Sequence, residues 1–183
     1  MEPTPSQTVG PFYGHALPFP GGGDLVEAGT PGAVTLRGLV LDGTGSPVPD
    51  ALVEIWQASA EGSLSGVPGS LDRAGRDFTG FARVATSADG HWSVRTLRPG
   101  PHRARTAPYL AVCVFARGLL HHLFTRAYLP QDAAALAADP VLSALPEERR
   151  ATLLAAEERP GVYRFDIRLQ GGAGEETVFL EFS

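Results

Sequence analysis

The chain has 183 residues, with 20 acidic and 15 basic side chains that give a formal net charge of −5 at pH 7. A chain of this length fits one domain with a short arm, and it is long enough to bury a core. The acidic balance argues against nucleic acid or an anionic membrane as the partner.

The single cysteine, Cys113, lies in an apolar run and has no second cysteine with which to form a disulfide. The sequence starts without a charged-then-apolar leader, and no apolar run reaches the about 18 residues that span a bilayer. We therefore expect a soluble protein of the reducing cytoplasm.

Residues 1–32 are rich in proline and glycine, which excludes a long helix there. The same stretch carries Phe12, Tyr13, Leu17 and Phe19, which a free tail would leave in water. We therefore predict an arm over residues 1–32 that packs on the body or on a partner. A frayed N-terminus is the alternative.

From residue 33 the sequence alternates apolar and polar side chains, as β-strands do. The alternation predicts strands at 33–42, 51–58, 81–87, 91–97, 109–117 and 119–129. The turn sequence Ala88-Asp89-Gly90 predicts that the strands on either side of it form a hairpin. In the second strand, the period of two places Trp56 on one face and Val53 and Ile55 on the other.

Towards the C-terminus the composition shifts to alanine, leucine and glutamate over residues 131–157, and a short helix is expected from Pro146. Two further strands, 162–170 and 177–182, flank a glycine-rich turn. Short strands with little helix predict a mainly β domain over residues 33–183. The pattern fits an antiparallel β-sandwich or a barrel, with one or two short helices.

Residue chemistry alone indicates no complete site. The five histidines form no H-x-H or H-E-x-x-H motif, and the lone cysteine cannot contribute to a thiolate metal site. No serine lies in a G-x-S-x-G motif, and no glycine-rich loop precedes a helix that could hold phosphate. His102 is the one histidine in a loop that converges on other candidate residues.

Several stretches match a known family. They are TPSQTVGPFY, ALVEIWQA, ADGHWSVRTLRPGP, VFARGLLHHLFTRAYL and YRFDIRLQG. Together, from residue 4 to residue 182, they resemble the alpha subunits of the intradiol ring-cleaving dioxygenases. The resemblance implies an antiparallel β-sandwich of the intradiol dioxygenase type. It also implies a homologous iron-bearing beta chain as the partner in an alpha–beta hetero-oligomer.

The resemblance further implies where iron is held. In the family the beta chain binds a ferric ion through two tyrosines and two histidines, donors that suit Fe(III). The matching positions here are Leu64, His102, Tyr109 and Ala111, and neither the leucine nor the alanine has a donor atom. The implied cofactor, Fe(III), is therefore expected on the beta partner, and this chain is expected to carry no metal ligand set and no catalytic residue.

The alpha arm of the family lines the substrate pocket, which lies where the alpha and beta chains meet. The matching positions here are Thr8, Gly10, Pro11 and Phe12, and Gly10-Pro11 would let the backbone approach a flat ring. An arginine suits the carboxylate of the substrate because its guanidinium binds carboxylates through two hydrogen bonds. Arg126 is the expected residue.

Two of these assignments have alternatives within the sequence. Arg117 is the second choice for the carboxylate-binding arginine. Alpha chains of the family often have tyrosine at the position of Phe12, so the hydroxyl contact is lost here unless Tyr13 supplies it.

The implied reaction inserts both atoms of O₂ between the two catechol hydroxyls of protocatechuate and gives 3-carboxy-cis,cis-muconate, on the route to β-ketoadipate. Two other readings remain open. One is a β-sandwich binding or structural module of dioxygenase ancestry that has no catalytic role. The other is a self-sufficient dioxygenase that assembles iron from scattered tyrosines and histidines.

Overall fold

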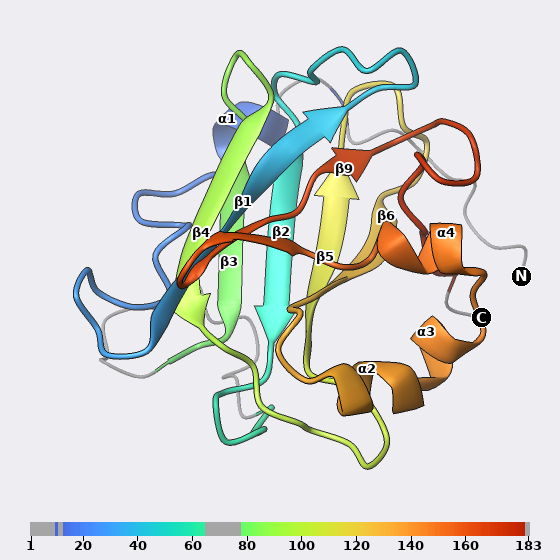
Figure 1. Ribbon diagram of the computed structural model, residues 1–183. Helices are drawn as coiled ribbons and strands as arrows, with labels where there is room; N and C mark the ends of the chain where they lie inside the picture. The colour runs from blue at the N-terminus through green and yellow to red at the C-terminus, as the bar shows by residue number, and fades with distance from the viewer. Residues whose placement is uncertain (1–9, 11–12, 65–77, 182–183) are drawn as a thin grey trace, which may run out of the picture.

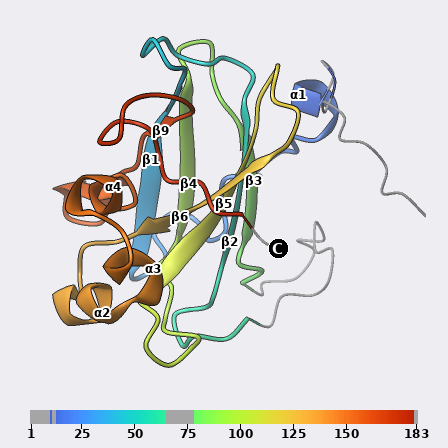
Figure 2. The same ribbon diagram turned by 90° about the vertical axis from the view of Figure 1, so that its right-hand side faces the viewer.

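Two β-sheets packed face to face form the body of the protein in the computed structural model, which describes residue 10, residues 13–64 and residues 78–181 (Figure 1). Figure 2 shows the sandwich after a 90° turn, with β1 of the first sheet to the left of β2 and β3 of the second. The predicted mainly β sandwich is confirmed.

The first sheet has the strand order β4-β1-β8-β7, and β9 also pairs with β1. Its strands are β1 (Ala33–Leu41), β4 (His91–Leu97), β7 (Ala156–Arg159), β8 (Val162–Arg164) and β9 (Ile167–Arg168). β1 runs antiparallel to β4 but parallel to β8 and β9. The sheet is therefore mixed, because the chain returns through the helical region before β8 and β9 join it.

The second sheet has the strand order β3-β2-β5-β6 and is antiparallel throughout. Its strands are β2 (Leu52–Gln57), β3 (Phe81–Ala85), β5 (Tyr109–Phe115) and β6 (Leu123–Tyr128). The inner faces of the two sheets enclose one core. Val53 and Ile55 are fully buried in it, whereas Trp56, the residue after Ile55, is 43% exposed, so the predicted opposite facing of Trp56 is confirmed.

The predicted hairpin over residues 81–97 is wrong. Ser87–Gly90 does form a tight turn, in which the Gly90 amide donates to the Ser87 carbonyl at 2.9 Å. However, β3 pairs with β2 and β4 pairs with β1, so the chain passes from one sheet to the other. Both strands have an apolar face, and placing them in opposite sheets lets Ala82 and Val94 both enter the core.

The described part of the chain has four short helices rather than the predicted one or two. They are α1 (Tyr13–Ala16), α2 (Ala133–Ala138), α3 (Pro140–Ser143) and α4 (Glu147–Ala151). Asp132 and Asp139 cap α2 and α3, and Pro140 and Pro146 interrupt the helical run, since proline lacks the amide that continues a helix. In both ribbon views α2, α3 and α4 lie on one side of the sandwich and α1 on the other.

The helices α2 and α3 pack against a second, smaller core. Its fully or nearly fully buried members are Ala107, Tyr128, Leu142, Leu153 and Val178. The strand predicted at 177–182 is reduced to a single bridge between Leu180 and Phe124 in the described residues. This segment instead packs along β6, and the Thr125 hydroxyl donates to the Val178 carbonyl at 2.7 Å.

The described part of the predicted arm lies on the body and joins the two sheets. The carbonyls of Gly22 and Gly23 accept hydrogen bonds from the amides of Arg83 in β3 and Arg95 in β4, at 2.9 and 2.7 Å. Leu25 is part of the main core. The division at residue 32 into an arm and a sandwich domain remains a prediction. Within the described residues, no helix is long and apolar enough to pass through a bilayer.

Candidate functional site

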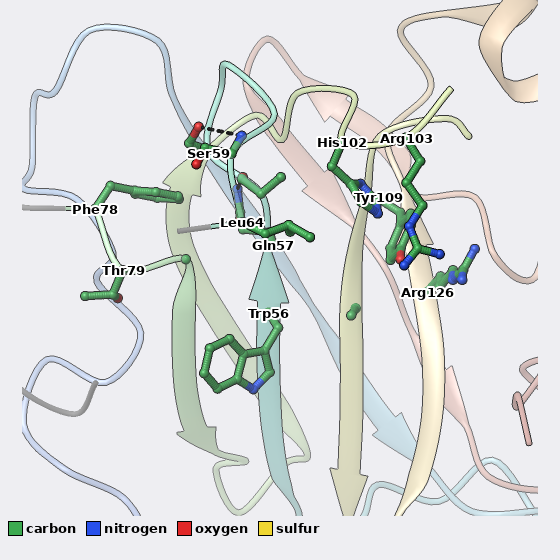
Figure 3. A pocket seen from close by; sticks show the side chains of 14 residues that line it. Trp56, Gln57, Ser59, Leu64, Phe78, Thr79, His102, Arg103, Tyr109 and Arg126 are labelled. Atoms are coloured by element: carbon green, nitrogen blue, oxygen red, sulfur yellow. Dashed lines mark hydrogen bonds between the residues drawn. The ribbon is translucent and has the colours of Figure 1, made fainter. Parts of the chain in front are cut away.

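A cavity of about 430 Å³ opens on the face of the second sheet that points away from the core (Figure 3). Its described lining comes from β2, β5, β6 and the loops at one end of these strands. The lining residues are Trp56, Gln57, Ala58, Ser59, Ser63, Leu64, Phe78, Thr79, Gly80, His102, Arg103, Tyr109, Ala111 and Arg126.

The strand register builds the floor of the cavity. Trp56 in β2 is paired with Ala111 in β5, and Ala111 is paired with Arg126 in β6. Directly paired residues project from the same face of a sheet, so these three side chains form a row across it. The alanine in the middle of the row leaves space between a large indole and a guanidinium.

Two loops close the end of the cavity, and glycines let them approach. The carbonyl of Ser59 accepts hydrogen bonds from the amides of Gly62 and Gly100, at 3.0 and 2.8 Å. A Cβ atom at Gly62, where φ is +85°, would lie 2.1 Å from the Pro101 carbonyl oxygen. This contact between the loops brings Leu64 and His102 to the same cavity.

Arg126 is held from two sides. Its guanidinium carbon lies 4.1 Å from the centre of the Tyr109 ring, within the range of a cation–π contact. Its Nη1 donates to the hydroxyl of Tyr128 at 3.2 Å, and that hydroxyl donates to Asp139 Oδ1 at 3.3 Å. Tyr128 and Asp139 are both fully buried, so the guanidinium has a fixed orientation at the cavity wall.

The positive charges affect the neighbouring titratable groups. The pKa of His102 is lowered below its usual value, first by burial and then by the positive charges of Arg103 and Arg126. Burial raises the pKa of Tyr128 to about 12, although Arg126 acts in the opposite direction. Both groups are therefore neutral at pH 7.

The cavity brings together all four positions at which the resemblance places the iron ligands of the family. Leu64, His102, Tyr109 and Ala111 all line it, and the imidazole of His102 meets the Tyr109 ring edge-on at 5.3 Å. The donor set does not fit the ferric ion that the family implies, because Leu64 and Ala111 offer no oxygen or nitrogen. Elsewhere in the described residues, no three His, Cys, Asp or Glu side chains lie close enough to share a metal ion.

The residues predicted to bind substrate are placed as follows. Arg126 lines the cavity, whereas Arg117, the alternative, pairs with Asp50 outside it. Gly10 has a φ of +77° with open space where a Cβ would be. Thr8, Pro11 and Phe12 lie outside the described residues.

Tyr13, the possible substitute for a hydroxyl at position 12, is only 6% exposed. Its hydroxyl lies buried without a hydrogen-bond partner among the described residues, and burial and the nearby Asp50 carboxylate raise its pKa.

Sequence reasoning missed two features of the cavity. The sequence places Trp56 on the strand face opposite Val53 and Ile55 but assigns it no site, and it ranks Arg103 and Arg105 below Arg126 as pocket residues; Trp56 and Arg103 both line the cavity. The pairing of Trp56 with Ala111 places Trp56 at the cavity. The sequence does not reveal this pairing, because it depends on the order of the strands in the sheet. Nothing in the sequence pattern around Arg103 distinguishes it from its neighbour Arg105.

Comparison with known proteins shows similarity to dioxygenases. The model of a dioxygenase family matches residues 9–171. The chain is 44% identical to the protocatechuate 3,4-dioxygenase alpha chain of Burkholderia cepacia, over 99% of this chain and 98% of that one. It is 32% identical to the beta chain of the same enzyme from the same species, over 75% of this chain and 64% of that one.

A solved structure is also similar. The dioxygenase domain of a dioxygenase–carbohydrate-binding protein fusion from Streptomyces sp. SirexAA-E matches with a TM-score of 0.59 and 25% sequence identity. The match covers 93% of this chain and 100% of that one.

Proposed function

This chain belongs to the intradiol ring-cleaving dioxygenase family. We propose that it is the alpha subunit of a protocatechuate 3,4-dioxygenase. The complete enzyme inserts both atoms of O₂ into the bond between the two hydroxyl-bearing carbons of protocatechuate and forms 3-carboxy-cis,cis-muconate. The observation that carries this proposal is the 44% identity to an alpha chain over nearly the full length of both chains.

In this proposal the ferric ion is bound by the partner beta chain. The support comes from the donor set, because two of the four positions in the cavity are occupied by Leu64 and Ala111. An imidazole and a phenol alone, from His102 and Tyr109, make a weak ferric site. This chain therefore contributes to assembly and to the shape of the substrate pocket.

The proposed partner is a homologous beta chain. The similarity of this chain to both the alpha and the beta chain of one species supports a pair built on a common fold. Trp56 and Phe124, two large side chains on the outer face of the second sheet, are 43% and 37% exposed. Exposed apolar groups of this size support burial of this face against another chain.

The proposed contacts to substrate are those expected from the sequence. Thr8, Gly10, Pro11 and Phe12 belong to the arm that reaches the substrate at the partner's iron. The positive φ of Gly10 supports a tight backbone turn there. Arg126 is proposed to bind a carboxylate, and its fixed guanidinium supports it over Arg117, which is paired with Asp50.

No observation on the described residues favours the alternative of a β-sandwich module without a catalytic role. A cytoplasmic location is part of the proposal, and the lone cysteine of the sequence supports it.

Co-expression with the beta chain of the same organism tests this function. We expect a complex with equal amounts of both chains, and oxygen uptake with protocatechuate that neither chain shows alone. Gly10→Val would keep the complex and lower the rate, because a β-branched residue disfavours a positive φ. Ring cleavage by the purified chain alone, or failure of the two chains to associate, would contradict the proposal.

A further inference from the structure

Arg126 is joined to a buried carboxylate through the phenol of Tyr128. Its Nη1 donates to the Tyr128 hydroxyl at 3.2 Å, and that hydroxyl donates to Asp139 Oδ1 at 3.3 Å. We propose that Tyr128 and Asp139 are positioning residues, which hold the guanidinium of Arg126 in the orientation that receives the carboxylate of protocatechuate. This inference rests on the proposed function, in which Arg126 binds that carboxylate. It adds two residues that act through Arg126 and do not touch the substrate.

The order of donors and acceptors in this network follows from the chemistry of its two ends. An arginine side chain only donates hydrogen bonds, and a carboxylate only accepts them. The hydroxyl between them therefore accepts from Arg126 and donates to Asp139. Burial raises the pKa of Tyr128 to about 12, so the hydroxyl keeps the proton that it donates at any pH suited to an assay.

Asp139 is a rigid end point for the network, because it is fully buried and bound on both oxygens. Its carboxylate accepts hydrogen bonds at 2.9 to 3.2 Å from the backbone amides of Ala107, Val141 and Leu142. Neither Asp139 nor Arg126 forms an ion pair within the described part of the chain. Since a buried charge is costly unless it is paired or hydrogen-bonded, the phenol of Tyr128 links two opposite charges that stabilise each other.

The guanidinium is held at one edge and on one face, and its other edge stays available. Tyr128 is fully buried in the second core, so it does not reach the substrate itself. The ring of Tyr109 lies 5.7 Å from that of Tyr128 and 4.1 Å from the guanidinium carbon of Arg126 (Figure 3). A guanidinium carries several N–H donors, and those not bound to Tyr128 are able to bind a carboxylate. Because the side chain is ordered in advance, the substrate loses less free energy on binding.

The chain contains a second network of the same composition, which provides a matched control. Arg98 donates to the hydroxyl of Tyr163 at 2.7 Å, and that hydroxyl donates to Glu157 Oε1 at 3.2 Å. Tyr163 is fully buried, as Tyr128 is, but Arg98 is not among the described residues that line the cavity of Arg126. Removal of the Tyr163 hydroxyl therefore measures the general effect of losing a buried phenol oxygen.

Titration calorimetry on the complete alpha–beta complex without O₂ tests the proposal, because binding is then measured without turnover. The ligands are protocatechuate and catechol, which keeps both hydroxyls and lacks the carboxylate. We expect Tyr128→Phe to weaken protocatechuate binding about three- to tenfold and catechol binding less than about twofold. Tyr163→Phe should leave both affinities unchanged. In air, Tyr128→Phe should raise KM for protocatechuate and leave kcat nearly unchanged, since the carboxylate contact is the same in the bound substrate and in the transition state.

Double variants show whether the two residues act through Arg126. Arg126→Gln should weaken protocatechuate binding, and Tyr128→Phe should then add no further loss. Asp139→Asn should also weaken protocatechuate binding, and it should have no further effect in the Tyr128→Phe chain. Tyr128→Phe keeps the buried ring, so the central test does not depend on the folding of the Asp139 variant.

Four results would overturn the proposal. They are an unchanged affinity of the Tyr128→Phe complex for protocatechuate, an equal loss for catechol, the same loss in Tyr163→Phe, and a further loss when Tyr128→Phe is added to Arg126→Gln. Failure of the proposed function is distinguishable from these results, because the unchanged complex would then neither bind nor cleave protocatechuate.

Discussion

At the scale of single residues, the four positions at which the resemblance places the iron ligands of the family line one cavity, and two of them carry no donor atom. Leu64 and Ala111 stand in the same cavity as His102 and Tyr109, so the strand and loop geometry that would gather four donors is present. The difference from the family's iron-binding chain, as the resemblance implies it, lies in the side chains of Leu64 and Ala111, which have no donor atom. Hydrophobic substitutions at these positions disturb neither the register nor the core, because the cavity lies on the outer face of the sheet.

Restoring the missing donors should therefore create an iron site. The double variant Leu64→Tyr/Ala111→His would present two phenols and two imidazoles in one cavity, the donor types that favour Fe(III). We expect it to retain more iron than the unchanged chain, with the visible absorption of a tyrosinate–ferric complex. The two single variants are the controls. A folded double variant that stays colourless and iron-free would show that the four positions do not converge closely enough.

The electrostatics of the cavity predict the titration of His102. Its pKa lies below the ordinary value of 6.5, so protonation favours the unfolded chain; stability from this group is complete above about pH 6.5 and falls as the pH drops below it. Arg103→Gln should raise the pKa of His102, because it removes a positive charge, while burial keeps it from returning fully to the ordinary value.

Nuclear magnetic resonance of the imidazole Cε1 proton measures this titration. Arg37→Gln serves as the control, since Arg37 pairs with Glu158 in the other sheet. A pKa of His102 at or above 6.5 in the unchanged chain, or no rise in the Arg103 variant, would refute the assignment of a positive cavity.

At the scale of elements, glycines decide how closely the loops of the site approach. Gly62 combines a φ of +85° with a Cβ position 2.1 Å from a carbonyl oxygen, whereas Gly118 has a φ of +90° and open space around it. Gly118→Ala thus introduces only the strain of the left-handed conformation, of about 1 kcal/mol. Gly62→Ala adds a clash with the backbone of Pro101.

We therefore expect Gly62→Ala to reduce the free energy of unfolding by about 2–4 kcal/mol, and Gly118→Ala by about 1 kcal/mol. Urea unfolding followed by tryptophan fluorescence measures both. Gly62→Ala should also weaken any ligand binding in the cavity, because it moves the loop that carries Leu64. Equal destabilisation by the two substitutions would contradict the described contact between the loops.

The sequence predicts most strands but not how they pair. The period of two predicts β1, β2 and β5 because each has one buried face. The turn at Ala88-Asp89-Gly90 predicts a hairpin that the structure lacks, since local turn chemistry cannot reveal that the flanking strands belong to different sheets. The short helices and the bridge at Leu180 depend on capping by Asp139 and on packing along β6, which are tertiary effects.

The sequence also predicts only some of the residues of the candidate site. The resemblance to a family gave Leu64, His102, Tyr109 and Ala111, and the structure brings them together. Arg126 followed from the match of its charge to a carboxylate. The part played by Trp56 depends on strand register, and register cannot be read from one strand alone.

At the scale of the whole molecule, the described residues form a sandwich whose two sheets are joined by the segment near Gly22 and Leu25. The outer face of the second sheet carries both the cavity and the exposed aromatic side chains of Trp56 and Phe124. A single face that combines a hollow with exposed aromatics suits a subunit that completes its site with another chain.

The iron content of this chain, purified alone after growth in iron-rich medium, tests whether the chain binds iron without a partner. We expect less than about 0.1 iron per chain and no visible colour, because two of the four family ligand positions have no donor atom. About one iron per chain, with the absorption of a tyrosinate–ferric complex, would contradict it, and the chain would then hold a metal site of its own.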